Sequence, residues 1–336
     1  MKYTNIDFNK KNILITGAAG FIGSSLCFYF QKNYPKANIV ALDCFRSGET
    51  FSNGNLKSFG HFKNLIGFKG KVISGDINDE KLLKKLKKSY KFDYIFHQAA
   101  ISDTTVQEQD LMIKTNVNAY ENLLKIAIKH KANMIYASSA ATYGDSNRFE
   151  VGYESPNNAY GFSKVMMDNI TYKYLNDGVD ISIVGLKYFN VYGPREFFKN
   201  KTASMVVQFG HQILRGDTPK LFEGSDKILR DFIYIEDVIQ ANIKACKPKK
   251  SGIYNVGTGE ARSFEDIVNI LQKELNIDNG KEYIPNPFIG SYQFFTQANI
   301  KTTRKNLGYE PKYSLEEGIK AYIPEIKRLF DTEVKK

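Results

Sequence analysis

Residues 17–23, Gly-Ala-Ala-Gly-Phe-Ile-Gly, are the stretch that most limits the folds open to this chain. They lie between the apolar run Asn12–Thr16 and a segment with helical patterning. Three glycines at this spacing allow a tight turn after a buried strand, close approach of backbone N–H groups to a pyrophosphate, and close helix packing. Asp43 follows twenty positions after Gly23, at the end of a second apolar run. This context predicts the phosphate-binding turn of a dinucleotide-binding fold.

Short β-rich runs recur after this turn, with helical stretches between them, at Lys71–Ser74, Tyr94–His97, 134–138 and 181–187. Such alternation is typical of a parallel sheet covered by helices on both faces. We therefore predict an α/β fold with a Rossmann-like, doubly wound parallel sheet. Residues 1–187 should form the NAD(P)-binding domain, with later segments returning to it.

Beyond residue 187 the pattern is less regular. It contains a Gly-Pro turn at 193–194, a helical stretch at 204–215, and short β-rich runs at Lys220–Phe222 and 253–256. We predict that residues 188–336 form mainly a smaller, mixed α/β substrate-binding lobe. Because ligands of doubly wound sheets bind outside the carboxyl ends of the strands, this lobe should close over that edge. Segment 46–69, rich in Gly, Ser and Asn, should be a surface loop near the adenosine end.

The formal net charge of +11 comes largely from lysines scattered along the chain. A diffuse positive field without a basic stripe argues against a nucleic-acid partner and suits a doubly anionic small molecule. The three cysteines, Cys27, Cys44 and Cys246, are far apart, which argues against a disulfide framework and against a zinc site, so no metal is expected. A polar amino terminus and the lack of a long apolar run predict a cytoplasmic protein without a membrane span.

Tyr160 and Lys164 are spaced Tyr-x-x-x-Lys in a stretch that reads as a helix. Positions i and i+4 share a helix face, so the ammonium would lie beside the phenol and lower its pKa. This spacing also arises by chance on exposed helices. Ser138 and Ser139, at the end of a predicted strand, favour a catalytic interpretation, because a hydroxyl there can donate to the substrate oxygen that the tyrosine deprotonates.

These motifs, with the later segment Tyr-Phe-Asn-Val-Tyr-Gly-Pro-Arg at 188–195, resemble the extended short-chain dehydrogenase/reductases and their NAD(P)-dependent epimerase/dehydratase family. Within that superfamily the chain resembles the ADP-glyceromanno-heptose 6-epimerases. The segments that indicate this branch are 137–144, 188–196, 219–225, 230–232 and 292–298. The resemblance extends from Asn12 to about Tyr322.

The resemblance implies particular site residues, to which the glycine turn and strand ends add others. The expected cofactor contacts are Gly17, Gly20, Phe21, Ile22, Gly23, Asp43, Cys44, Arg46, Asp76, Ile77, Gln98, Ala99, Ala100, Ile101, Ser102, Asn116, Lys164 and Val191. The expected catalytic residues are Ser139, Tyr160, Lys164 and Lys199. The expected substrate contacts are Ser139, Asn190, Lys201, Gln208, Phe222, Glu223, Gly224, Ser225, Arg230 and Tyr292.

Simpler interpretations of several of these residues stay open. Asp76 can equally be a helix cap. Phe222 can belong to the core, and Arg230 can form a structural ion pair with Asp231. Lys199 can be a solvated loop lysine or a contact to the ADP pyrophosphate.

The resemblance also implies NADP as the cofactor, with NAD as the alternative. The family usually offers an Asn and a Lys near the 2′-phosphate, whereas Cys44 and Thr50 occupy the matching places here. Arg46 and Ser47 could replace them, because a guanidinium and a hydroxyl suit a phosphate. Gln208 also replaces a His at one substrate position.

The implied activity is that of an isomerase that epimerises ADP-heptose at C6 through transient oxidation, for lipopolysaccharide core biosynthesis. A homo-oligomer, usually a pentamer, is implied by the resemblance alone. The nearest alternatives are a nucleotide-sugar 4-epimerase or dehydratase of the same fold. Dehydratases carry an acidic pair after the Ser/Thr hydroxyl, whereas Ser139 is followed by Ala140 and Ala141. A catalytically silent, cofactor-sensing regulator is a further alternative, and the presence of Ser139, Tyr160 and Lys164 argues against it.

Overall fold

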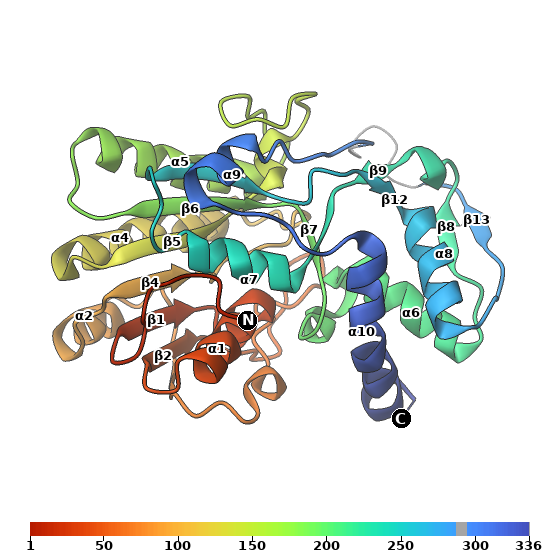
Figure 1. Ribbon diagram of the computed structural model, residues 1–336, viewed down its shortest axis with the longest axis horizontal. Coiled ribbons are helices and arrows are strands. Elements are labelled where there is room, and N and C mark those ends of the chain that lie inside the picture. The colour runs from red at the N-terminus through yellow and green to blue at the C-terminus, as the bar shows by residue number, and fades with distance from the viewer. Residues whose placement is uncertain (287–293, 336) are drawn as a thin grey trace.

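The computed structural model describes residues 1–286 and 294–335 and is built on one seven-stranded parallel sheet (Figure 1). The strand order is β11-β6-β5-β4-β1-β2-β3. The strands are β1 (Asn12–Thr16), β2 (Asn38–Asp43), β3 (Lys71–Ser74), β4 (Tyr94–His97), β5 (Asn133–Ser139), β6 (Ile183–Tyr188) and β11 (Gly252–Val256). The predicted α/β, doubly wound, Rossmann-like fold is confirmed.

Alternating side chains of the inner strands β1, β2, β4 and β5 enter two separate hydrophobic clusters, one on each face of the sheet. Ile13 and Ile15 of β1 pack in one cluster with α1 (Phe21–Asn33) and α7 (Ile235–Lys244). Leu14, between them, packs in the other cluster with helices that cover the opposite face, which are α2 (Glu80–Ser89), α4 (Ala119–His130) and α5 (Ala159–Asn176). This period of two is what a strand buried on both faces requires.

The strand order reverses beside β1, and this places the ligand-binding edge. The chain runs outward from β1 through β2 to β3 and then crosses to β4 on the other side of β1. The loops that leave the carboxyl ends of β1 and β4 diverge there and open a crevice. Gly17 follows β1 and Gln98 follows β4, so both predicted cofactor segments begin at this point.

A smaller group of elements lies beside the sheet, at the right of Figure 1. It contains α6 (Met205–Arg215), α8 (Phe264–Leu275), α10 (Leu315–Leu329) and the short parallel pair β8 (Lys220–Phe222) and β13 (Glu282–Ile284). Ser263 and Ser314 begin α8 and α10 with reciprocal capping-box hydrogen bonds. Side chains of α6, α8 and α10 join the cluster that includes β6, so this group packs against the core of the sheet domain.

The chain returns to the main sheet after entering this group. Strand β11 pairs with β6, and α7 packs on the same face as α1. Two short pairs lie between the two parts, β7 (Asn190–Tyr192) with β10 (Phe232–Tyr234), and β9 (Leu229–Arg230) with β12 (Arg262–Ser263). The remaining helices are α3 (Gln109–Met112), which continues as a π-helix to Asn118, and α9 (Lys301–Leu307). The division into two domains at residue 188 stays a proposal. Strand β11 and helix α7 lie after this residue in the sequence but belong to the sheet domain.

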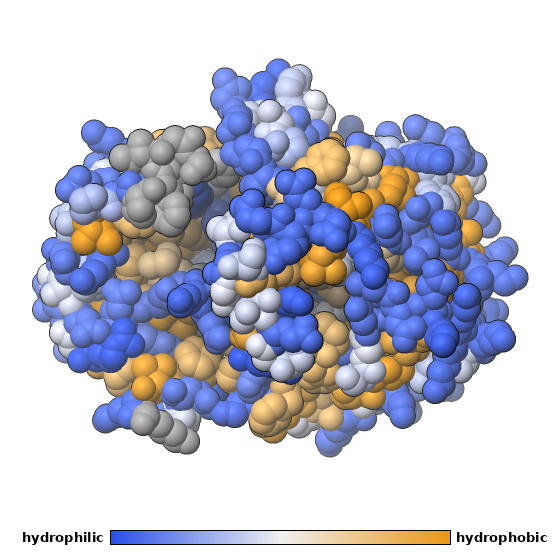
Figure 2. Space-filling model, turned by 180° about the vertical axis from the view of Figure 1, so that it is seen from behind, coloured by the Kyte–Doolittle hydropathy of each residue, from blue (hydrophilic) through white to orange (hydrophobic). Residues whose placement is uncertain are grey.

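The segment predicted as a loop at 46–69 contains a short 3₁₀ helix, Phe62–Leu65, and a single bridge between Thr50 and Leu56. Strand β6 begins two residues later than the apolar run suggests, because Ile181 packs against the core from the preceding loop. None of the described helices is long and apolar enough to cross a membrane. The face in Figure 2 is mainly hydrophilic, with hydrophobic side chains in small, scattered groups.

Candidate functional site

The glycine turn has the conformation that its sequence predicts. Gly17 has φ +66°, and a Cβ atom there would lie 2.7 Å from the backbone nitrogen of Ala99. A Cβ on Gly23 would lie 2.1 Å from the carbonyl oxygen of Gly17. Helix α1 begins after Gly20, which offers no side-chain cap. Its first backbone N–H groups are therefore available to an anion, as a pyrophosphate would require.

Asp43 closes the turn from the end of β2. One carboxylate oxygen accepts a hydrogen bond from the backbone N–H of Ala19 (2.9 Å), and the other accepts one from Phe45 (2.8 Å). Burial raises the pKa of this carboxyl, and these amide donors act in the opposite direction. Asp43 thus holds the glycine turn against the following loop while it borders the cavity.

Tyr160 and Lys164 lie in the first turns of α5, one turn apart. Asn158 caps the helix by accepting the backbone N–H of Gly161 (2.8 Å). The Lys164 ammonium lies 5.8 Å from the centre of the Tyr160 ring and donates to the carbonyl of Ala137 (2.7 Å). Only 1% of Lys164 is exposed. The helix cap and the Ala137 carbonyl together fix the lysine beside the tyrosine.

The pKa of Tyr160 differs from the expectation. Lys164 was expected to lower it, but burial raises the pKa of the phenol, and the opposing influence is a hydrogen bond with Ser139. Burial also lowers the pKa of Lys164 to about 8, while Asp168 acts against that shift. The expected direction for Tyr160 was wrong because desolvation penalises its charged form.

A buried polar network lies behind these groups. Asp168 of α5 accepts hydrogen bonds from Tyr136 (2.7 Å), Ser138 (3.0 Å) and Lys187 (2.7 Å). Lys187 also pairs with Glu154 at 3.1 Å. Since these side chains come from β5, β6 and α5, the network fixes the end of β5, where Ser139 lies.

Lys199 approaches from a different part of the chain. It lies in a 3₁₀ segment, Phe197–Thr202, that is interrupted at Asn200 by a φ of +54°. The side chain is half-buried, and burial lowers its pKa, whereas Glu196 and Asp103 act to raise it. A desolvated lysine of this kind can exchange a proton closer to neutral pH than a solvated one.

These groups border one cavity of about 460 Å³. It runs from the glycine turn and Asp43, past the carboxyl ends of β1 and β4, to Ser139, Tyr160 and Lys199. The glycine turn, the Tyr160 phenol and three lysines, Lys57, Lys164 and Lys199, therefore border one space. That space suits a dinucleotide with a second ligand beside its far end.

Comparisons with known proteins agree with this geometry. Residues 13–257 match the NAD dependent epimerase/dehydratase family. The chain belongs to the NAD dependent epimerase/dehydratase family. It is 39% identical, over 92% of its length and 96% of the relative's, to the ADP-L-glycero-D-manno-heptose-6-epimerase of Brachyspira hyodysenteriae.

Two solved structures extend the comparison. The Helicobacter pylori ADP-L-glycero-D-manno-heptose-6-epimerase superposes with a TM-score of 0.87 and 52% identity, covering 97% of this chain and 99% of that one. The Thermotoga maritima UDP-glucose 4-epimerase, solved with UDP-glucose, gives a TM-score of 0.83 and 27% identity, covering 94% and 99%. The protein is thus an enzyme that epimerises a nucleotide sugar.

Most of the residues predicted for this epimerase site border the cavity. They are Gly17, Gly20, Phe21, Ile22, Gly23, Asp43, Cys44, Asp76, Ile77, Gln98, Ala99, Ala100, Ile101, Ser102, Ser139, Tyr160, Lys164, Asn190, Val191, Lys199 and Arg230. Asp76 does not cap α2, because Asp79 takes that role, so the helix-cap alternative was wrong.

Other predicted residues lie elsewhere among the described ranges. Asn116 does not border the cavity; it is buried and binds both the N–H and the C=O of Ile101 at 2.9 Å. The Arg46 guanidinium donates to the Phe198 carbonyl. Gln208 donates to the Ala203 carbonyl (2.7 Å). Lys201, which is exposed, and Phe222, Glu223, Gly224 and Ser225 do not border the cavity either. Tyr292 lies outside the described residues.

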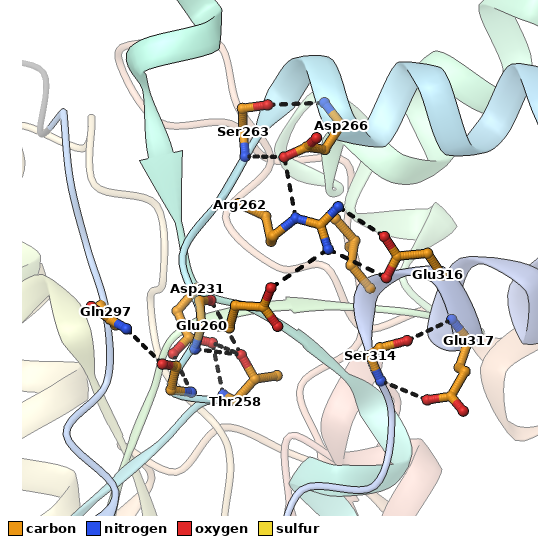
Figure 3. A network of polar contacts seen from close by, with 12 residues as sticks. Asp231, Thr258, Glu260, Arg262, Ser263, Asp266, Gln297, Ser314, Glu316 and Glu317 are labelled. Atoms are coloured by element: carbon orange, nitrogen blue, oxygen red, sulfur yellow. Dashed lines mark hydrogen bonds and ion pairs between the residues drawn. The ribbon is translucent and has the colours of Figure 1, made fainter.

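Arg230 and Asp231 take separate roles. Arg230 is almost fully buried and borders the cavity. The Asp231 carboxylate accepts the N–H and hydroxyl of Thr258, both at 2.7 Å, as well as the N–H groups of Gly259 and Ala298 (Figure 3). These contacts account for Asp231 as an anchor for the loop after β11.

Several cavity residues were missed by the sequence reasoning. Lys57 and Ser58 border the cavity near Cys44, whose thiol lies 3.4 Å from the Ser58 hydroxyl. Asp103 and Thr296 also border it. Segment 46–69 was expected near the adenosine end, but no local motif indicated which of its side chains would face inward.

Proposed function

We propose that this protein interconverts ADP-D-glycero- and ADP-L-glycero-D-manno-heptose by epimerisation at C6, supplying heptose for lipopolysaccharide core biosynthesis. The observation that carries the proposal is the shared cavity, in which Tyr160 and Lys199 approach the space beyond the glycine turn from separate elements. The two 6-epimerases in the comparison support the substrate.

A nicotinamide cofactor bound at the glycine turn would supply the hydride acceptor and donor for this chemistry. Gly17 and Gly23 allow the tight turn and the close packing of α1 against it, which would bring backbone N–H groups to a pyrophosphate. Asp43, which borders the cavity, would face the adenosine ribose. Lys164, beside Tyr160, would bind the nicotinamide ribose. These residues fit a dinucleotide through their own geometry.

Within this proposal, Tyr160 exchanges a proton with the sugar oxygen at C6, and Ser139 hydrogen-bonds to the same oxygen. Inversion requires the transient ketone to present either face, and one phenol in a fixed helix cannot obviously serve both orientations. Lys199 is the second proton-handling group. Asn190, at the start of β7, and Arg230, in β9, border the cavity and contact the substrate.

NADP is the proposed cofactor, with Lys57 and Ser58, which border the cavity beside Cys44, as the proposed contacts of a 2′-phosphate. Lys57 pairs with Glu49 at 3.1 Å and would exchange this partner for the phosphate. Arg46 and Ser47, which the sequence analysis favoured, have other contacts: Arg46 binds the Phe198 carbonyl, and the Ser47 hydroxyl accepts from Glu49. We also propose that the enzyme is a cytoplasmic homo-oligomer. Size-exclusion chromatography with light scattering tests the oligomer.

The activity is tested by incubating purified protein with ADP-D-glycero-D-manno-heptose and following the C6 stereochemistry by NMR. Formation of the L-glycero isomer without added cofactor supports the proposal. Chromatography of the denatured protein identifies the retained nucleotide, and finding only NAD(H) would overturn the NADP assignment. Turnover of UDP-glucose but not of ADP-heptose would instead identify a 4-epimerase, the alternative that the Thermotoga maritima structure favours.

A further inference from the structure

Glu196 is a buried carboxylate close to the site that the proposed mechanism does not use. It is 0% exposed. One oxygen accepts the backbone N–H of Gly193 (3.0 Å) and the hydroxyl of Ser204 (2.8 Å), and the other accepts the backbone N–H of Ser204 (2.7 Å). None of these donors is a lysine or arginine side chain. A carboxylate is costly to bury, so its presence here calls for a physical reason.

The hydrogen bonds of Glu196 join the two ends of one segment, 193–204. This segment leaves β7 and returns at the start of α6. Its backbone has positive φ values at Arg195 (+81°) and Asn200 (+54°), which residues other than glycine seldom adopt. Such a backbone persists when surrounding contacts over-determine it. The carboxylate supplies those contacts at both ends.

Lys199 lies inside the segment that Glu196 closes. Its own backbone N–H donates to the Glu196 carbonyl (2.9 Å). The two side chains also interact electrostatically. Burial lowers the pKa of Lys199 and raises the pKa of Glu196, and the opposite charge of each group acts against the shift of the other. Asp103, from the loop after β4, is a second carboxylate that favours the charged form of Lys199.

We propose that Glu196 is a positioning residue that fixes segment 193–204 and keeps the Lys199 ammonium in place at the cavity. This inference rests on the proposed role of Lys199 as the second proton carrier. Glu196 itself touches neither the cavity nor the reacting atoms. Among the described residues it acts through Gly193 and Ser204 and through its charge, which also helps to raise the pKa of the buried Tyr322 of α10.

The test compares Glu196→Gln with Asp237→Asn in the full-length protein. Asp237 is a matched control, because it is 1% exposed and its carboxylate accepts the backbone N–H groups of Lys312 (2.9 Å) and Tyr313 (3.0 Å) away from the cavity. With ADP-D-glycero-D-manno-heptose as substrate, Glu196→Gln should lower kcat about 10- to 100-fold with little change in KM. Asp237→Asn should lower Tm but leave kcat unchanged.

The pH dependence of kcat distinguishes a positioning role of Glu196 from a purely structural one. If one limb of the wild-type profile of kcat against pH is absent in Lys199→Met, that limb is assigned to the titration of Lys199. Loss of the Glu196 charge removes an anion that favours the ammonium, so that limb should move to lower pH by about one unit in Glu196→Gln. In Glu196→Asp, which keeps the charge on a shorter side chain, the limb should stay at its wild-type pH while kcat falls.

A double variant distinguishes the possible failures. If Glu196 acts through Lys199, adding Glu196→Gln to Lys199→Met should cost less than about twofold more in kcat. A full additional loss, or an unshifted pH limb in Glu196→Gln, would overturn the positioning role and leave the proposed function intact. If Lys199→Met keeps wild-type kcat and pH profile, the proposed role of Lys199 fails, and this inference fails with it. If Glu196→Gln does not fold, the kcat of Glu196→Asp is compared with that of Asp237→Asn. Equal kcat values in these two variants would overturn the positioning role of Glu196.

Discussion

The two candidate proton-handling residues lie in regions that are built in different ways. Tyr160 is held within a capped helix, one turn from Lys164, and the end of β5 beside it is fixed by a buried network around Asp168. Lys199 lies in an irregular segment that is fixed both from within, by Glu196 at its two ends, and by contacts from distant parts of the chain. The Asn64 side chain donates to the Arg195 carbonyl (3.1 Å), and Arg46 donates to that of Phe198.

The difference teaches what each kind of construction needs. A helix fixes the relation of i to i+4 through its own hydrogen bonds, so a short motif is sufficient to place Tyr160 and Lys164. An irregular segment has no such repeat, and its side chains are placed by contacts that the fold brings together. The following tests ask whether the two regions contribute to catalysis in the same way.

The largest effect is expected at Tyr160. Tyr160→Phe keeps the ring and removes the hydroxyl, so it should fold normally and lose about 10²–10⁴ in kcat, the range for general acid–base catalysis. Tyr174→Phe, on the same helix but bound to Glu121 outside the cavity, should keep kcat within about twofold. Steady-state kinetics on the heptose substrate check both variants, and near-wild-type turnover by Tyr160→Phe would refute the role.

Lys199 should show the next largest effect. Lys199→Met is expected to lower kcat about 10²-fold with substrate binding nearly intact, because it removes a group needed in the transition state. Lys199→Arg keeps the positive charge but cannot readily transfer a proton. Recovery of activity in the arginine variant, or weakened binding alone in the methionine variant, would indicate a phosphate contact instead.

Lys164 allows a test by stability and pH. The pKa of Lys164 in the folded protein, about 8, lies below the ordinary value of 10.5. The folded state therefore loses this proton at a lower pH than the unfolded state. Between these two values the unfolded state binds more protons, and the stability of the wild type should therefore rise with pH. Relative to Lys164→Met, the free energy of unfolding should increase by about 1–3 kcal/mol across this window.

Denaturant titrations at several pH values, with cofactor removed, measure this difference. Lys125→Met is the control, since the Lys125 side chain is 55% exposed. A difference between wild type and Lys164→Met that does not change with pH would show that the lysine is solvated in the folded protein.

The smallest expected effect is at the adenosine end, where the loop is again irregular. Lys57→Ala should weaken NADP by about tenfold relative to NAD, the value of one charge-assisted hydrogen bond. Arg46→Ala should leave that ratio unchanged and lower kcat instead, because its guanidinium binds the segment that contains Lys199. Calorimetric titration with each dinucleotide decides this, and the opposite pattern would restore the role first expected for Arg46.

The parts of the molecule that follow a local repeat could be predicted from the sequence. The glycine turn was predicted from the spacing of its glycines. The structure shows why glycine is needed there, because a Cβ at Gly17 or Gly23 would lie less than 3 Å from backbone atoms. Most of the sheet was also predictable, because its first six strands lie in short β-rich runs that alternate with helical stretches. The position of Lys57 at the cavity was not predictable, since its loop is held by hydrogen bonds from the Asn53 and Asn55 side chains to Asp103, about fifty residues away. Glu196 gave no signal either, because burial of its carboxylate appears only in the folded chain.

The return of β11 to the sheet has a consequence for recombination between relatives. An exchange of everything after residue 188 would also replace the strand that covers β6, and any misfit there would leave a long, apolar strand edge exposed to aggregation. An exchange of residues 189–251 alone keeps β6 and β11 as a native pair and transfers the segments around Asn190, Lys199 and Arg230. A chimera intended to accept another sugar should therefore be cut at two junctions, as a cassette within the sheet domain.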